Sequence, residues 1–265
     1  MNRLTQKFQQ LKKENTKAIL PYITPEFPIA GTTVPLILAL EKAGASIIEV
    51  GIPFSDPLAD GPTIQQSSHT AIQNGATISL VLQRVKEARL HTQIPIVLMG
   101  YINPVLHYGI EKFLVDASAS GVDGLIIPDL LPEESTEYRM LAAKYNISVV
   151  FLLAPTSSDK RIHHVDSLST DFTYCVSVTG VTGSRNTFDS LDDFLRRVRR
   201  NSTKPFVVGF GISTHDHVQQ VWKHADGAVV GSALIQKIAH EKNSDAVAEV
   251  AGKFLSTLIR ASLKT

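Results

Sequence analysis

Eight short apolar segments, separated by residues with helical spacing, recur along the chain. Most of them lack the polar and apolar alternation that marks a strand with one face in water. Strands that are apolar throughout are buried on both faces, as in a parallel sheet covered by helices. The predicted strands are residues 18–23, 47–50, 94–99, 124–127, 147–152, 172–178, 205–209 and 227–230.

Between these segments, apolar residues recur at intervals of three and four, which predicts amphipathic helices. Leu4, Phe8 and Leu11 have this spacing and predict an additional helix before the first strand. Thr32 or Thr33 is placed to cap the next helix, which stops at glycine 44. Further helices are expected at residues 62–74, 78–89, 110–119, 132–145, 160–168, 191–200, 214–223, 233–235 and 245–263.

Eight strand–helix units within 265 residues match a closed (β/α)8 barrel, the TIM barrel. The helices at 62–74 and 78–89 both lie between the second and third strands, so the barrel carries an extra helix after strand 2. An open, doubly wound sheet is the competing architecture, and the missing nucleotide-binding fingerprint counts only weakly against it. No linker or low-complexity segment interrupts residues 1–265, so we expect a single barrel domain.

The formal net charge of +1 provides no strong field to attract nucleic acid or an anionic membrane. The one basic cluster, Arg196, Arg197, Arg199 and Arg200, falls late in a predicted helix, where cations stabilise the helix dipole. Cys175 is the only cysteine, which excludes an internal disulfide and favours a reducing compartment. Because the N-terminus is polar and the apolar runs are strand-sized, we expect a cytoplasmic protein without nucleic-acid or membrane partners.

The stretch 48–61 contains three carboxylates at the point where a buried strand gives way to a loop. Glu49 lies in the strand, where burial raises its pKa toward the range that suits proton transfer. Asp60 lies in the loop, which prolines stiffen, and its environment is expected to be wetter. Two carboxylates in unlike environments suit an acid and an electrostatic partner. The competing interpretations are a paired structural charge for Glu49 and a turn residue for Asp60, which precedes a glycine.

In a TIM barrel the active site forms where the strands end and the following loops begin. The last three of these loops, at 180–184, 209–213 and 231–232, are rich in glycine, which lets backbone N–H groups approach an anion closely. The helix expected after 231–232 points its N-terminus at the same place, an arrangement that binds phosphate. Together the loops predict a phosphate site, although each alone is also compatible with a tight turn.

The other end of this predicted site combines the two carboxylates with an apolar floor. The combination suits a substrate with a flat apolar part and a phosphorylated tail, and it indicates acid–base isomerisation or carbon–carbon cleavage without a cofactor. No metal site is expected, because the histidine pairs at 163–164 and 215–217 do not lie with carboxylates at strand ends. The residues available for the floor are Tyr22, Ile64, Ile126 and Phe210.

The stretch 48–61 resembles the signature of tryptophan synthase α subunits, with which it agrees at every position without a gap. The resemblance covers essentially the whole chain. It implies a retro-aldol cleavage of indole-3-glycerol phosphate to indole and glyceraldehyde 3-phosphate. The other matching segments are 62–65, 100–104, 128–130, 180–183, 209–213 and 231–232.

This resemblance also implies roles for single residues. Glu49 would protonate C3 of the indole and help remove the proton of the side-chain hydroxyl. Asp60 would accept the indole N–H and stabilise positive charge on the ring, and Tyr174 would lie beside the reacting carbons. The loop of Asp56 and Pro57, which is expected to face the partner, and the loop of Thr182 would close over the substrate, with Thr182 touching Asp60. The other implied substrate contacts are Tyr22, Ile64, Tyr101, Ile126 and Phe210, with Gly183, Gly211, Gly231 and Ser232 on the phosphate.

The partner implied by the resemblance is a tryptophan synthase β subunit, in an α2β2 assembly with a tunnel for indole. Pyridoxal phosphate would belong to that β subunit, and this chain would need no cofactor of its own. The alternatives are a phosphate-handling barrel isomerase or epimerase, which would not need the loop 54–61, and a subunit that chiefly activates its partner. The presence of both Glu49 and Asp60 argues against the second.

Two departures from the family pattern lie beside the expected site. Residues 24–28 replace a small, glycine-containing turn, and Tyr22 stands where phenylalanine is common. Both are expected to affect the rim of the pocket or the packing of its loops, and neither touches the proposed chemistry.

Overall fold

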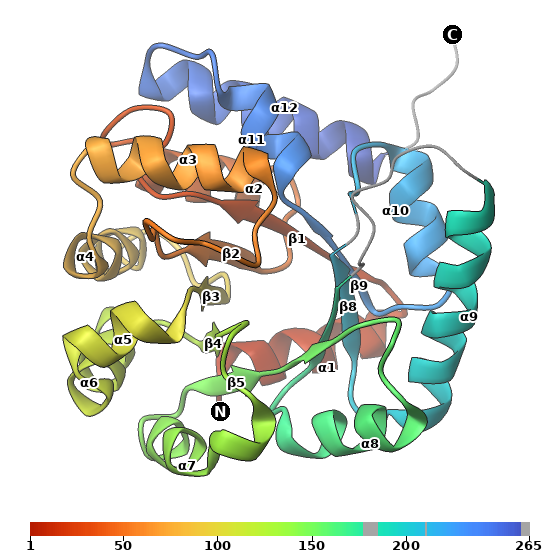
Figure 1. Ribbon diagram of the computed structural model, residues 1–265. Helices are drawn as coiled ribbons and strands as arrows, with labels where there is room; N and C mark the ends of the chain where they lie inside the picture. Colours follow the sequence, from red (N-terminus) through yellow and green to blue (C-terminus); the bar gives the residue numbers. More distant parts are fainter. Residues whose placement is uncertain (177–184, 210, 261–265) are drawn as a thin grey trace, which may run out of the picture.

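The computed structural model describes residues 1–176, 185–209 and 211–260, without the side chains of residues 185–190. In this part of the chain, nine short strands form one parallel sheet in the order β5-β4-β3-β2-β1-β9-β8-β7-β6 (Figure 1). The end strands β5 (Ser148–Val150) and β6 (Leu152–Leu153) are separated only by Phe151. They are two halves of one strand, so the sheet closes into an eight-stranded barrel, and the doubly wound alternative is excluded.

Each of the eight predicted segments contains an observed strand, because a short run buried on both faces is what the wall of a parallel barrel requires. The sixth prediction extends to residues 177 and 178, which lie outside the described residues. The other strands are β1 (Ala18–Ile23), β2 (Ile48–Gly51), β3 (Ile96–Met99), β4 (Gly124–Ile126), β7 (Thr173–Val176), β8 (Phe206–Gly209) and β9 (Gly227–Val230).

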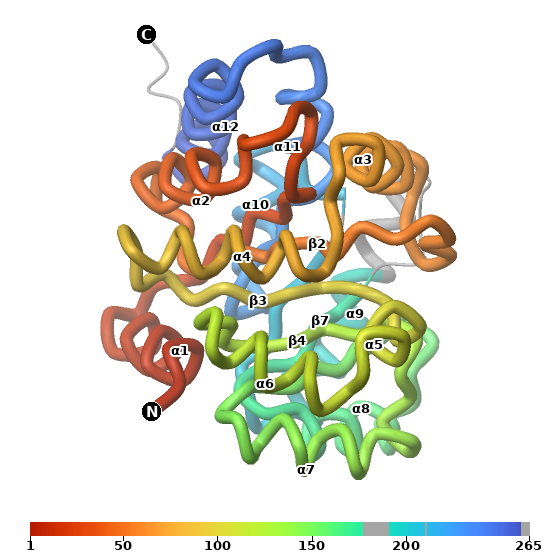
Figure 2. The backbone as a smooth tube through the Cα atoms, turned by 90° about the vertical axis from the view of Figure 1, so that its left-hand side faces the viewer, coloured from red at the N-terminus to blue at the C-terminus, as the bar shows by residue number. Residues whose placement is uncertain are grey.

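Helices surround the barrel, and Figure 2 shows α1 at one end and the orange loop between β2 and α3 at the other. In the described ranges, no helix is both long and apolar enough to cross a membrane. The helices are α1 (Arg3–Glu14), α2 (Thr33–Lys42), α3 (Pro62–Gln73), α4 (Ile78–Ala88), α5 (Ile102–Tyr108), α6 (Ile110–Ser120), α7 (Thr136–Lys144), α8 (Asp159–Leu168), α9 (Arg185–Asn201), α10 (His215–Trp222), α11 (Ser232–Ile238) and α12 (Ser244–Ile259), with the 3-10 turn η1 (Pro132–Glu134).

Helix α5 is not predicted by the sequence pattern. Pro104, which suggests a break, falls in the first turn of α5, where a backbone N–H has no partner in the helix to lose. Asp129, which follows β4, accepts a hydrogen bond from the Ile102 N–H at 2.9 Å and satisfies one of the free donors at the start of α5. The proline at the start of this short helix therefore prevents its prediction from the spacing of apolar residues.

The prediction that Thr32 or Thr33 caps α2 is wrong, because neither side chain bonds a backbone N–H of the first turn. Thr32 stands at the N-cap position, but its hydroxyl donates to the carbonyl oxygens of Phe27 and Ile29, at 3.0 and 2.9 Å. Thr33 donates to Glu26 Oε1 at 2.8 Å and accepts the Glu26 N–H at 2.9 Å. Both hydroxyls hold the loop between β1 and α2 together instead of capping the helix.

Glu26 is the centre of that loop, which is the segment that departs from the family pattern. Its side chain is 1 % exposed and accepts hydrogen bonds from Arg84 Nε at 2.9 Å and Gly31 N at 2.6 Å. Its backbone has a φ of +58°, a left-handed conformation that only surrounding contacts maintain in a residue other than glycine. Asn74 adds a hydrogen bond of 2.8 Å to the Glu26 carbonyl oxygen, so the loop is attached to the end of α3.

Two apolar clusters lie on the two sides of the barrel wall. The larger cluster fills the space between the sheet and the outer helices. The smaller one fills the barrel interior, where Val97, Val207 and Val229 meet Leu4 and Phe8 of α1. The apolar face of α1 therefore closes the end of the barrel at which the strands begin, as the spacing of its apolar residues predicts.

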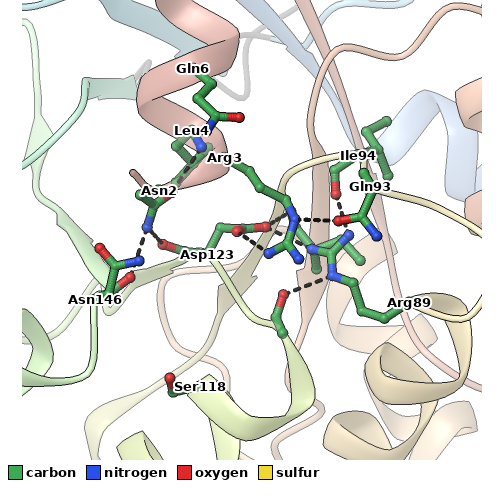
Figure 3. Close-up of polar contacts among 12 residues, drawn as sticks. Asn2, Arg3, Leu4, Gln6, Arg89, Gln93, Ile94, Ser118, Asp123 and Asn146 are labelled. Carbon is green, nitrogen blue, oxygen red and sulfur yellow. Dashed lines mark hydrogen bonds and ion pairs between the residues drawn. The ribbon is translucent and has the colours of Figure 1, made fainter.

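Asp123 fastens α1 to the barrel (Figure 3). Its carboxylate accepts hydrogen bonds from Arg3 Nη1 at 2.9 Å, Arg89 Nη2 at 2.7 Å and the Ile96 N–H at 2.8 Å. Its backbone carbonyl accepts the Asn2 side-chain amide at 2.8 Å. Because Asp123 is 3 % exposed, each of these partners offsets the cost of burying its charge.

We expect Arg89→Met to destabilise the fold by about 3 kcal/mol, because it leaves the buried Asp123 carboxylate without one of its two cations. The free energy of unfolding in urea measures this loss. The matched control is Lys112→Met, which breaks the exposed Lys112–Asp116 ion pair and should leave the stability unchanged. Equal stability of both variants would show that the Asp123 network does not hold α1 in place.

Candidate active site

Glu49 lies in the middle of β2 and points into the barrel. Its register partners are Tyr22 on β1 and Val97 on β3, and Val97 belongs to the interior cluster. The side chain is 1 % exposed, and neither carboxyl oxygen has a hydrogen-bond partner among the described residues. Burial, together with the nearby Asp60 charge, raises the pKa of Glu49 to about 8. Glu49 is therefore a protonated, unpaired acid at neutral pH.

Asp60 lies at the end of the loop 54–61, which α3 holds at both ends. Ser68 accepts the Phe54 N–H at 2.8 Å and donates to the Phe54 carbonyl oxygen at 3.0 Å. Gln65 Nε2 donates to the Asp60 carbonyl oxygen at 2.9 Å. These contacts aim the carboxylate across the mouth of the barrel, where its charge raises the pKa of Glu49.

Tyr101 gives Asp60 the partner that Glu49 lacks. The Tyr101 hydroxyl donates to Asp60 Oδ2 at 3.0 Å and accepts the Ala59 N–H at 2.9 Å. Its ring lies against that of Phe54, with 5.5 Å between the ring centroids. Burial raises the pKa of Asp60, and the Tyr101 hydrogen bond opposes this rise. The two carboxyls thus occupy unlike environments, as the sequence predicts.

The side chains of two tyrosines, one on β1 and one on β7, lie over glycines at the ends of neighbouring strands. A Cβ added to Gly51 would lie 2.1 Å from Tyr22 Oη, and one added to Gly209 would lie 2.6 Å from Tyr174 Oη. A side chain at either glycine would displace a phenol from its place. Burial raises the pKa of Tyr174, with Glu49 the largest charge acting on it, so its hydroxyl stays neutral.

Gly51→Ala is expected to lower kcat/KM by about tenfold, because the new methyl group displaces the Tyr22 ring from the mouth. Steady-state kinetics of the purified variant measure the effect. The control is Gly252→Ala on α12, where the nearest atom to the added Cβ is 3.5 Å away, an ordinary contact distance. Similar kinetics in the two variants would show that the position of the Tyr22 ring is not critical.

The expected phosphate end lies beside Tyr22. A Cβ on Gly231 would lie 3.5 Å from Tyr22 Cβ, and Gly231 occupies the N-cap position of α11, which begins at Ser232. The first N–H groups of a helix have no partner within it and point outward. Gly211 has a φ of +43°, and a Cβ there would meet no atom within 4 Å. The other residues predicted for this end and its lid, Thr182, Gly183 and Phe210, lie outside the described residues.

The remaining predicted site residues lie in different parts of the structure. Ile126 is 1 % exposed in the interior cluster, on the inner face of the barrel. Ile64, in contrast, packs in the outer cluster and is 9 % exposed. Pro57 is buried in the loop 54–61, and Asp56 is exposed. Among the described side chains, no group of three or more histidine, cysteine or acidic residues is arranged to hold a metal ion.

A hollow of about 440 Å³ lies at the opposite end of the barrel, between α1 and the starts of β7–β9. Most of its charged groups are engaged in ion pairs and hydrogen bonds of the fold. Lys17 and Arg199 form ion pairs with Asp226, at 3.4 and 2.7 Å, and Asp171 accepts the Thr5 hydroxyl. We therefore place the candidate site at the carboxyl ends of the strands.

The family model described as "Tryptophan synthase alpha chain" matches residues 8–260. The chain belongs to the tryptophan synthase alpha chain family. A relative from Pelodictyon phaeoclathratiforme, named tryptophan synthase alpha chain, is 47 % identical over 267 aligned positions, which cover 97 % of this chain and 98 % of the relative.

Solved structures of the family have the same fold. Tryptophan synthase subunit alpha from Legionella pneumophila superposes with a TM-score of 0.89 at 34 % identity, covering 97 % of each chain. A chain of the tryptophan synthase complex from Pyrococcus furiosus gives a TM-score of 0.83 at 40 % identity, covering 91 % of this chain and 97 % of its own length. The predicted TIM barrel with its additional helices is thereby confirmed.

Sequence reasoning does not find the contacts that hold Asp60 in place. The Tyr101 hydroxyl and Asp60 are 41 positions apart, and nothing in either segment indicates their contact. Ser67 and Ser68 do leave a signal, because they stand at helical spacing with Ile64 and Ala71 on the buried face of α3. Polar residues on a buried helix face need partners, so two adjacent serines there indicate specific hydrogen bonds.

Proposed function

We propose that this chain cleaves indole-3-glycerol phosphate to indole and glyceraldehyde 3-phosphate, as a lyase of tryptophan biosynthesis. The observation that carries the proposal is the buried, unpaired Glu49 carboxyl, which faces the Asp60 carboxylate across one barrel mouth. A neutral acid in a buried setting and a nearby anion are the two groups that this reaction needs.

The reaction begins with proton transfer from Glu49 to C3 of the indole ring. The ring then becomes an indolenine with positive charge on its nitrogen, which Asp60 stabilises by accepting the N–H hydrogen bond. Glu49, now ionised, takes the proton of the hydroxyl on the carbon attached to C3. The carbon–carbon bond breaks, its electron pair returns to the ring, and the hydroxyl carbon becomes the aldehyde. Two proton transfers balance the reaction, and no electrons are exchanged.

The phosphate of the substrate is proposed to lie on the start of α11. Gly231 and Ser232 would supply backbone N–H groups there, and Gly211 and Gly183 would supply others from the neighbouring loops. Tyr174, Tyr22 and Tyr101 would surround the indole, with Ile126 below and with Ile64 and Phe210 at the rim. Thr182 would close over Asp60. Because acid–base chemistry suffices for the reaction, we propose that this chain carries no cofactor or metal.

A β subunit that holds pyridoxal phosphate is the proposed partner, in an α2β2 assembly in the cytoplasm. Three large apolar side chains support a docking face next to the site. Leu58, Leu106 and Leu131 are 92 %, 54 % and 51 % exposed, and they follow the neighbouring strands β2, β3 and β4. Apolar side chains gathered on one surface favour association. The exposed Asp56 belongs to the same loop as Leu58, so indole would leave beside the partner.

The test is the release of indole from indole-3-glycerol phosphate by the purified chain. We expect slow release by the chain alone and a large increase in turnover when a tryptophan synthase β subunit is added. Isomerisation of a sugar phosphate without any indole release would instead support the alternative barrel enzymes. Activation of the β subunit without cleavage would support a role as an activating subunit.

A further inference from the structure

The loop 54–61 is held from two directions, and the two sides hold different parts of it. On one side, Ser68 of α3 bonds both the N–H and the carbonyl oxygen of Phe54. Gln65, also on α3, donates to the carbonyl oxygen of Asp60. On the other side stands Tyr101, two residues after β3, which is the one described residue that bonds the Asp60 side chain. Helix α3 therefore places the backbone of the loop, and Tyr101 places the carboxylate.

The Tyr101 hydroxyl makes both of the bonds that a phenol can share between a donor and an acceptor. It accepts the Ala59 N–H at 2.9 Å, and its own proton is therefore available for Asp60 Oδ2, which lies 3.0 Å away. Burial and the Asp60 charge raise the pKa of Tyr101, so the hydroxyl keeps this proton. One oxygen of the carboxylate is thus occupied, while no described residue donates to Oδ1.

Tyr101 is itself fixed to the barrel wall through the residues on either side of it. The Gly100 N–H bonds the Ile126 carbonyl oxygen of β4 at 3.0 Å. The Ile102 N–H bonds Asp129 Oδ1 at 2.9 Å. The Tyr101 side chain is 7 % exposed, so it has little freedom to turn away from the loop. Its hydroxyl is therefore a fixed point from which the loop can be oriented.

We propose that Tyr101 is a positioning residue, whose hydroxyl turns the Asp60 carboxylate so that Oδ1 faces the indole N–H. The inference rests on the proposed function. Without the hydroxyl, α3 still holds the backbone of Asp60, but the carboxylate is free to rotate about its side-chain bonds. Small displacements of a charged group from the reacting atoms cost rate without unfolding a protein.

The first experiment compares variants of the purified chain by steady-state kinetics with indole-3-glycerol phosphate. Tyr101→Phe keeps the ring that contacts Phe54 and removes only the hydroxyl. We expect kcat to fall by about tenfold while KM changes by less than about twofold, since the Asp60 charge remains but is no longer oriented. A wild-type kcat in Tyr101→Phe would overturn the inference.

The matched control is Tyr108→Phe, which removes a bond of the same kind outside the site. The Tyr108 hydroxyl, on α5, donates to Asp116 Oδ2 at 2.7 Å. Both substitutions thus take one phenol away from one carboxylate, and both are expected to cost a little stability. Only Tyr101→Phe should lower kcat. An equal loss of kcat in the control would assign the effect to stability and overturn the inference.

The second experiment tests whether Tyr101 acts through Asp60. In an Asp60→Asn background no charge is left to orient, so Tyr101→Phe should lower the residual rate by less than about twofold. The same tenfold loss in both backgrounds would show that the hydroxyl acts independently of the Asp60 carboxylate, and this would overturn the inference.

The third experiment does not depend on activity. The Ala59 N–H loses its acceptor in Tyr101→Phe, so its hydrogen exchange should become about five- to tenfold faster, with no change in Tyr108→Phe. Unchanged exchange at Ala59 would overturn the inference. If the wild-type chain releases no indole, the proposed function fails and this inference fails with it. Indole release by the wild type, with unchanged exchange and unchanged kcat in Tyr101→Phe, overturns the inference alone.

Discussion

Glu49→Gln is expected to lower indole formation by a factor of about 10⁴ while the fold stays intact. Glutamine has the shape of protonated glutamic acid but cannot give its proton to a carbon atom. Because no described residue bonds the Glu49 carboxyl, the substitution breaks no hydrogen bond in the described part of the chain. Single-turnover and steady-state assays of indole release measure the loss, and near-normal turnover would remove Glu49 from the mechanism.

The pH dependence of the stability of the same variant tests independently whether Glu49 is protonated in the folded protein. The folded pKa of about 8 lies above the ordinary value of 4.5, so the folded protein binds a proton that the unfolded chain releases between these values. Stability contributed by the protonated acid is therefore lost as pH rises through that window, and Glu49→Gln should remove this loss. Urea unfolding at a series of pH values measures it.

The matched control for Glu49→Gln is Glu26→Gln, in the other glutamate that is 1 % exposed. Glu26 is bonded to Arg84, Gly31 and Thr33, and it lies outside the site. Its substitution should lower stability and leave kcat near the wild-type value. Substitution of Glu26 should therefore lower stability and that of Glu49 activity, because Glu26 has hydrogen-bond partners and Glu49 has none among the described residues.

Asp60→Asn is expected to lower kcat by about 10²-fold and to change KM little. Asparagine still accepts the Tyr101 hydrogen bond through its side-chain oxygen but has no charge to offset the positive indolenine ring. Steady-state kinetics and binding of a non-reacting substrate analogue separate rate from affinity. Loss of binding with an unchanged rate at saturation would contradict the role given to Asp60.

Asp56→Asn controls for the general effect of removing a carboxylate from this loop. Asp56 is exposed, four residues before Asp60, and its charge does not act on Glu49. In the isolated chain this variant should keep the wild-type kcat. A loss as large as that of Asp60→Asn would indicate that the loop, and not the Asp60 charge, is what the reaction requires.

Much of the fold could be predicted because the barrel wall imposes one simple pattern. Each strand must be short and apolar on both faces, and segments such as 18–23 and 227–230 satisfy this without regard to their neighbours. Helix α5 could not be predicted, because Pro104 looks like a break unless its place in the first turn is known. The cap of α2 was mispredicted, since Thr32 and Thr33 bond a loop whose shape Glu26 determines.

The two acids of the candidate site could be predicted from the sequence, but the side chains that contact their surroundings could not. Glu49 stands out because a charge in an apolar strand requires an explanation. The contacts of Tyr101 with Asp60 and of Thr24 with Ser67 join segments about 40 positions apart, and only coordinates reveal them. Such contacts are long-range by nature, and the position of Tyr22 over Gly51 is likewise apparent only in the folded protein.

The pH dependence of kcat/KM for indole release tests the central claim, that Glu49 acts as a neutral acid. The pKa of Glu49 is about 8, and burial raises the pKa of Tyr22, Tyr101 and Tyr174 far above this value. We predict that kcat/KM falls as pH rises through about 8, because the acid loses its proton. A value that stays flat or rises from about pH 7 to about pH 9 would contradict a protonated Glu49 as the catalytic acid.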